Sequence, residues 1–278
     1  MSTSREAVYL RHVLALCKAG SQIPVESVEA LIEGDGLVDP LLVELVRSRA
    51  IREDAWGPLW AIVVLGERRS SPGLGAILDA ARTDNDLVHE GVEFALGRYG
   101  AAAVDPILCF LRDNPGLDGR VHLYSALART RDRLALDFLI RQLRLDEDCM
   151  GAIAWALAET HDPKAVASLE AIVARFGRRD PELVEALEAA VHPGPEEPAP
   201  AEDWRAHWTW LEEEAAESEE EAGEPSGAAN AEDDADGPNF LPRCYDVRCP
   251  VCRADLEYDT TDGTVKVTQP RDSERRAS

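Results

Sequence analysis

Apolar residues recur along the chain with helical spacing and with a fixed longer period. The pair Ala-Leu stands at 95–96, 126–127, 156–157 and 186–187, so successive pairs are 31, 30 and 30 residues apart. Val64-Leu65 stands 31 residues before the first of these pairs. A fixed period near 30 residues is typical of repeat proteins, in which each unit packs mainly on its neighbours.

Each period divides into two amphipathic helical patterns. One period shows apolar residues three or four apart in two runs, first at Val88, Val92, Ala95, Leu96 and Tyr99, then at Val104, Ile107, Leu108 and Leu111. This spacing predicts two helices that bury one face each. The alanine of each Ala-Leu pair is small, which favours close contact between helices.

Helix ends recur in phase with this pattern. Gly100 separates the two runs, and glycine commonly ends a helix because it tolerates positive φ. Asp162-Pro163 and Asp180-Pro181 predict an N-cap followed by proline at the first helical position. Pro106 is expected in a first helical turn, where proline is tolerated.

The repeated segments resemble a known family. ALGRYGAAAVDPILCFLRD and ALAETHDPKAVASLEAIV are similar to the HEAT-like repeat first named in phycobilisome lyases, over about residues 57–191 and more loosely over 5–56. The resemblance implies an all-α fold, a solenoid of stacked helix pairs. We expect an N-terminal helical cap with irregular repeats at 1–56 and regular repeats at 57–192. Trp56 and Trp60 are expected to fill gaps between the two.

Residues 193–237 have a different composition. They open with four prolines and hold sixteen acidic residues against one basic residue, Arg205, which predicts a disordered acidic linker. Within it, Trp204, Trp208 and Leu211 are spaced i, i+4, i+7, which predicts a helix at 201–216 with these residues on one face. They are candidate docking residues. The segment either caps the end of the solenoid or docks in a groove, on a partner or on this chain's own solenoid.

Residues 238–270 predict a small C-terminal module. Two β-strand patterns flank Thr-Asp-Gly, a hairpin signal, and the polar stretch 271–278 is expected to be a disordered tail. The candidate metal ligands are Cys244, Cys249 and Cys252. Cys-Pro-Val-Cys is similar to the knuckle of zinc ribbons, in which two thiolates bind one tetrahedral Zn ion. The sequence does not assign the fourth ligand. Two alternatives to a zinc site are a vestigial knuckle that binds no metal and a redox-active CxxC pair.

Charge and hydropathy exclude some classes of function. The 278 residues carry a formal charge of −24 with no basic stripe, which argues against nucleic-acid binding. The longest uncharged run, at 56–66, is too short to cross a membrane. Charges interrupt residues 1–20, so we expect no signal peptide and a cytoplasmic location. Isolated Cys17, Cys109 and Cys149 are expected to be small buried apolar residues.

Two further clusters need an interpretation. The basic residues Arg129, Arg131, Arg133, Arg141 and Arg144 are either solvated helix ends or a docking patch for an acidic segment. His89-Glu90 is similar to the His-Glu pairs of deoxyhypusine hydroxylase, but one pair cannot supply a di-iron site. We therefore expect His89, like His12, His122 and His161, to be an ordinary surface or interface histidine.

These patterns favour a non-enzymatic protein-binding scaffold or adaptor that acts through the repeat surface. No nucleophile elbow, Walker loop or dinucleotide-binding motif occurs in the sequence. Two alternatives stay open. One is a phycobilin-lyase-like or other chromophore-handling enzyme, which the resemblance suggests. The other is a metal- or redox-handling accessory protein that acts through the cysteines.

Overall fold

The computed structural model describes residues 2–48, 56–177, 180–192 and 204–213, and three short strands after residue 246. The chain divides into two compact units, residues 1–218 and 219–278. In its described part, the first unit is built from helices, which confirms the all-α prediction.

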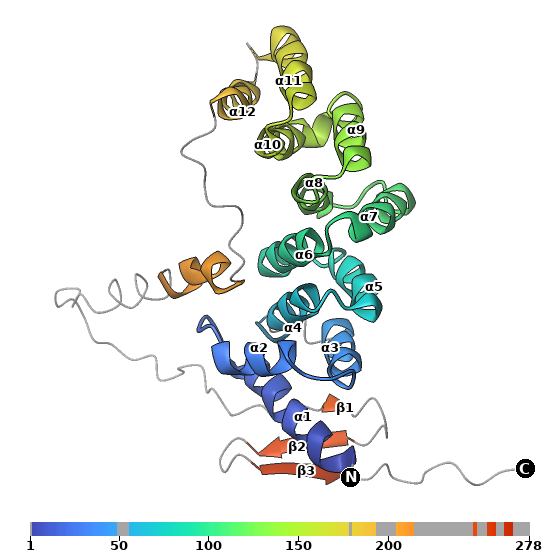
Figure 1. The fold of residues 1–278 in the computed structure, drawn as a ribbon, viewed down its shortest axis with the longest axis vertical. Helices are drawn as coiled ribbons and strands as arrows, with labels where there is room; N and C mark the ends of the chain where they lie inside the picture. The colour runs from blue at the N-terminus through green and yellow to red at the C-terminus, as the bar shows by residue number, and fades with distance from the viewer. Residues whose placement is uncertain are drawn as a thin grey trace, which may run out of the picture. The chain divides into compact units, whose positions relative to one another are not determined.

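The helices of the first unit follow one another through short connections. They are α1 (Ser2–Lys18), α2 (Val25–Ile32), α3 (Val38–Arg47), α4 (Trp56–Glu67), α5 (Ser71–Ala80), α6 (Asp86–Tyr99), α7 (Ala101–Asp113), α8 (Arg120–Arg129), α9 (Arg133–Gln142), α10 (Met150–Thr160), α11 (Pro163–Phe176) and α12 (Pro181–Val191), with 3-10 turns η2 (Glu147–Cys149) and η3 (Trp204–His207). Figure 1 shows them as a stack in two layers. The first layer holds α4, α6, α8, α10 and α12, and the second holds α3, α5, α7, α9 and α11. Helices α1 and α2 pack against α4.

The Ala-Leu pairs lie where the first-layer helices meet. The four alanines of these pairs are all buried, as are the leucines of the first three pairs. Gly66 of α4 continues this row, because a Cβ atom there would lie 2.6 Å from the Cα of Ala95 on α6. The small residues therefore permit backbone contact between neighbouring helices of the first layer.

One turn recurs between the two helices of successive pairs. Arg69, Gly100, Arg131 and His161 have φ values of 48°, 57°, 52° and 50° and lie 31, 31 and 30 residues apart. Each residue reverses the chain from a first-layer helix to a second-layer helix. This conformation is unfavourable for residues other than glycine, so three of the four turns carry a local cost.

The side chains around two of these turns repeat as well. The Thr130 hydroxyl donates to the Leu127 carbonyl at 2.6 Å, and the Thr160 hydroxyl donates to the Leu157 carbonyl at 2.7 Å. Asp132 and Asp162 then cap the following helices, accepting from backbone N–H groups at 2.7 and 2.8 Å. Capping groups of this kind typically stabilise a helix by about 1 kcal/mol.

Three local predictions differ from the structure. Pro106 lies inside α7 rather than in its first turn, so the carbonyl of the residue four positions earlier loses a helical partner. Asp180-Pro181 does form the predicted N-cap and first helical position of α12, but the expected capping hydrogen bond from the Asp180 side chain is missing. Cys109 is exposed, because it lies on the outward side of α7 while Ile107 and Leu111 are buried.

In the residues that the structure describes, the second unit contains three short strands, β1 (Val247–Arg248), β2 (Asp255–Asp259) and β3 (Thr264–Thr268). They form an antiparallel sheet in the order β1-β2-β3. Leu256 of β2 pairs with Val247 on one side and with Val267 on the other. The candidate ligands Cys244, Cys249 and Cys252 lie outside the described residues.

Candidate functional site: an aromatic strap on the first layer

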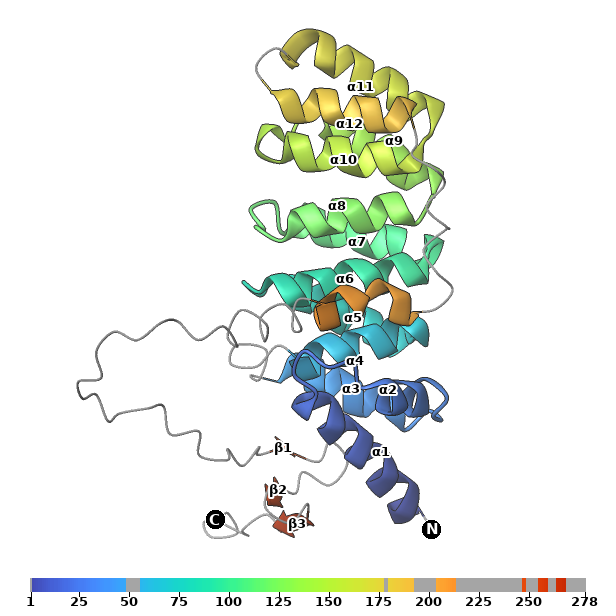
Figure 2. The ribbon, with the colours of Figure 1, turned by 90° about the vertical axis from the view of Figure 1, so that its left-hand side faces the viewer.

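Residues 204–213, here called the strap, lie beside α4 and α6 (Figures 1 and 2). The strap consists of η3 followed by a helical turn at 209–213. The predicted single helix at 201–216 is thus interrupted at Trp208, and its outermost residues lie outside the described ones. The ring contacts of the strap are with α4 and α6 rather than with α11 or α12, so the strap does not cover that end of the stack.

Aromatic rings form the centre of the strap site. Trp60 of α4 meets Trp204 and Trp208 edge-on, with ring centroids 6.3 and 5.7 Å apart. Phe94 of α6 meets Trp208 in the same way at 5.7 Å. Trp60 and Trp208 are fully buried, while Trp204 and Leu211 are 6% and 3% exposed. Edge-to-face pairs of this kind add about 0.5–1.5 kcal/mol to the apolar burial. Trp60 therefore packs against the strap, and its helix α4 also contacts the cap helices α1 and α2.

The sequence of α4 explains why the strap lies here. Residues 57–66 are all buried, so this helix is covered on every side. A helix that is hydrophobic all round has to be enclosed by other elements. Its neighbours α1, α3, α5 and α6 contact it, and the strap covers the ring of Trp60.

In the described residues, side chains make the contacts between the strap and the stack. Arg205 forms an ion pair with Glu29 of α2, and both side chains are about half exposed. Among the described residues, the backbone hydrogen bonds of the strap are internal, from Trp208 to Arg205 and from Leu211 to Trp208. Recognition therefore depends on the spacing and shape of the side chains.

A polar cluster borders the aromatic centre. Glu93 of α6 accepts from Arg129 of α8 at 2.7 Å and lies 3.3 Å from Nδ1 of His122. His207 of the strap stacks on Phe94 with centroids 4.8 Å apart. Burial, and next the positive charge of Arg129, lower the pKa of His207 to about 4, against an opposing effect of Glu93. His207 is therefore neutral when the strap is bound at neutral pH.

His89 is buried between helices, an interface histidine, and its ring lies 4.9 Å from that of His122. Burial and then His122 lower the pKa of His89, whereas burial and then Glu93 raise the pKa of Glu90. Within the described ranges, no three His, Cys, Asp or Glu side chains are arranged to hold a metal ion. The cluster instead supplies the charged edge against which the strap lies.

Several buried nitrogen atoms at the strap site lack a hydrogen-bond partner. In the described part of the chain they include Nε1 of Trp60, Nε1 of Trp208 and Nε2 of His207. An unsatisfied buried donor or acceptor costs about 1–3 kcal/mol. The apolar fit of the strap is close, but its polar fit is incomplete.

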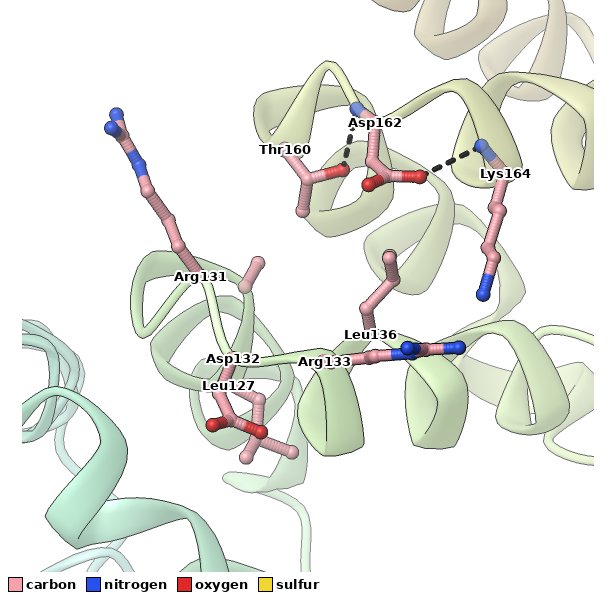
Figure 3. A pocket seen from close by; sticks show the side chains of 9 residues that line it. Leu127, Arg131, Asp132, Arg133, Leu136, Thr160, Asp162 and Lys164 are labelled. Atoms are coloured by element: carbon pink, nitrogen blue, oxygen red, sulfur yellow. Dashed lines mark hydrogen bonds between the residues drawn. The ribbon is translucent and has the colours of Figure 1, made fainter.

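A second candidate site lies between two of the repeated turns (Figure 3). It is a pocket of about 450 Å³ lined by Leu127, Ala128, Arg131, Asp132, Arg133, Leu136, Thr160, Asp162 and Lys164. Its two aspartates are helix caps, as described above. The predicted basic cluster is thus divided, since Arg129 pairs with Glu93 while Arg131 and Arg133 line the pocket.

No protein-family model and no curated protein matches this chain. The resemblance to HEAT-like repeats consequently stays a prediction carried by the repeated residues. In the described portion of the chain, no helix is long and apolar enough to cross a membrane.

Proposed function

We propose that this chain is a non-enzymatic protein-binding scaffold whose stack is a HEAT-like α-solenoid. The observation that carries the proposal is the strap, a separate segment held on the first layer by its side chains. A repeat surface that binds one short helical segment in this way has the chemistry to bind others. The recurring turn with a positive φ, at steps of 31, 31 and 30 residues, supports the repeat assignment.

Beyond the strap, the first layer carries further exposed apolar residues. Trp155 of α10 is 37% exposed and Val191 of α12 is 45% exposed. Aromatic residues are enriched at protein interfaces. We expect a partner to contact this part of the layer, which the strap leaves open.

Site-specific photocrosslinking tests the scaffold proposal. A photoreactive phenylalanine analogue at Trp155 should capture a discrete protein in cells, and the same analogue at exposed Cys109 of α7 should not. The captured protein should then bind the purified full chain. Equal capture from both positions, or a bound chromophore with no protein partner, would count against a scaffold.

We also propose a Zn-stabilised module at the C-terminus. In the sequence, Cys249 and Cys252 fall between the paired strands β1 and β2, and Cys244 precedes β1. A sheet this small rarely folds on apolar burial alone, and three thiolates suit zinc. Metal content of the untagged full chain tests this. About one zinc per chain, lost in Cys249→Ser, supports the module, whereas zinc-free protein with freely reacting thiols removes it.

A further inference from the structure

The strap covers an apolar surface on the stack, but in the part of the chain that the structure describes it leaves buried polar atoms at that surface without hydrogen bonds. Trp60 is fully buried beneath the strap, yet its Nε1 donor has no partner among the described residues. The same is true of Nε1 of Trp208. Their desolvation cost reduces the affinity of the strap for the stack.

The contacts also show what the surface selects. The rings of Trp204 and Trp208, four residues apart, pack on Trp60, and Trp208 also packs on Phe94. Leu211, three residues after Trp208, is buried as well. A basic side chain next to the first ring meets Glu29 of α2. The contacts described between residues 204–213 and the stack are made by side chains, so a segment with this pattern of side chains carries the groups that the surface binds.

We propose that the strap is a displaceable internal competitor, and that the face formed by α4 and α6 binds a helical segment of a partner protein. That segment carries aromatic residues four apart, a basic residue after the first of them, and an acceptor side chain for Nε1 of Trp60. The inference rests on the proposed scaffold function and specifies one of its partners by chemistry. Binding of the strap and binding of the partner exclude each other, since both cover Trp60.

A synthetic peptide of residues 201–216 tests the site in the full chain. The receptor carries Trp204→Ala and Trp208→Ala, so that its own strap no longer competes. The labelled peptide should bind this receptor at least tenfold more tightly than it binds the wild-type chain. A receptor with Leu145→Ala, at a 68% exposed position away from the strap, should bind the peptide as wild type does. A peptide with both tryptophans replaced by alanine should not bind. Equal binding to the double variant and wild type would overturn the proposal.

Charge reversal tests the register of binding. An Arg205→Glu peptide should bind the open receptor about two- to fivefold more weakly, as expected for a half-exposed ion pair. Adding Glu29→Arg to the receptor should restore its binding. A merely hydrophobic association would show neither the loss nor the rescue, and that result would overturn the proposed register.

A second measurement uses wild type and does not depend on the double variant folding. Excess peptide, made with an N-methylated Arg205–Ala206 amide so that trypsin cannot cut it, should displace the internal strap and so accelerate tryptic cleavage of the chain after Arg205. Unchanged cleavage at saturating peptide would contradict displacement. If the peptide fails in both assays while photocrosslinking at position 155 still captures a protein, this inference falls and the scaffold proposal stands.

Discussion

Helices α4 and α10 occupy comparable places in the first layer but differ in what covers them. In α4 every residue from 57 to 66 is buried, and the strap covers Trp60. In α10 the inward residues are buried while Trp155 is 37% exposed. The comparison teaches that a repeat helix with apolar residues all round indicates an additional element bound to it.

Replacing Trp208 should uncover α4 and so remove most of the difference in coverage between α4 and α10. Trp208→Ala removes the ring that contacts both Trp60 and Phe94, and truncation of a buried tryptophan costs about 3–5 kcal/mol. The strap should be released, which is measured as faster tryptic cleavage after Arg205. Trp155→Ala on α10 should change stability by less than about 1 kcal/mol. Equal protection of Arg205 in Trp208→Ala and wild type would show that the ring does not hold the strap.

Gly66 of α4 and Gly151 of α10 show that the two helices differ in how closely they pack on their neighbours. A Cβ at Gly66 of α4 would meet the backbone of Ala95, whereas a Cβ at Gly151 of α10 would meet the end of the Glu182 side chain, which can rotate away. We expect Gly66→Ala to destabilise the stack by about 1–3 kcal/mol. Gly151→Ala should be neutral or stabilise it by up to about 1 kcal/mol. Urea unfolding of the two variants measures both, and a stabilising Gly66→Ala would contradict the close contact.

Acid should release the strap. The pKa of His207 is about 4 when the strap is bound and is expected to be near 6.5 when it is released, so the released strap binds the extra proton. Strap binding is therefore complete above pH 6.5 and weakens as the pH falls toward 4, by at most about tenfold per unit. Tryptophan fluorescence follows the transition.

The control for this titration is His207→Phe, which keeps a ring against Phe94 but cannot take up the proton. His207 is half-buried near Arg129 and Glu93, so partial solvent screening makes tenfold per unit an upper limit. The variant should lose the pH dependence between 6.5 and 4. A strap that is released equally in both proteins would place the titrating group elsewhere.

The repeated turns should respond alike in both regions, with the smallest effects. His161→Gly and Arg131→Gly relieve left-handed backbone at φ 50° and 52°, so each should raise stability by up to about 1 kcal/mol. Gly100→Ala should lower stability, because φ 57° with ψ −138° is a backbone conformation that essentially glycine alone adopts. Thermal unfolding measures these shifts, and a destabilising His161→Gly would show that its side chain makes a contact that outweighs the backbone strain.

Much of the helical stack was predictable, because its contacts are local and periodic. The Ala-Leu pairs mark the first layer directly, since each alanine has to fit against the next helix at the same register. Of the recurring turns, only Gly100 was recognisable in advance. Arginine and histidine give no signal for positive φ, so Arg69, Arg131 and His161 were missed.

The location of the strap was not predictable from its own sequence. Trp204, Trp208 and Leu211 indicated a buried face, but a contact with a helix about 150 residues earlier leaves no periodic pattern. The signal was present in α4, where WGPLWAIVVLG has no polar side to face solvent. Pairing that segment with the isolated aromatic residues of the acidic region would have located the site.

Because the strap belongs to the same chain as its binding face, the two meet at a fixed effective concentration. Twelve residues, 192–203, connect α12 to the strap, and short tethers typically give effective concentrations of about millimolar order. A partner present at micromolar levels would then need roughly a thousandfold greater intrinsic affinity to occupy half of the sites. The tether thereby sets the lowest affinity at which a partner displaces the strap. Weakly binding aromatic segments do not displace it, whereas a partner that is abundant or better matched to Trp60 does.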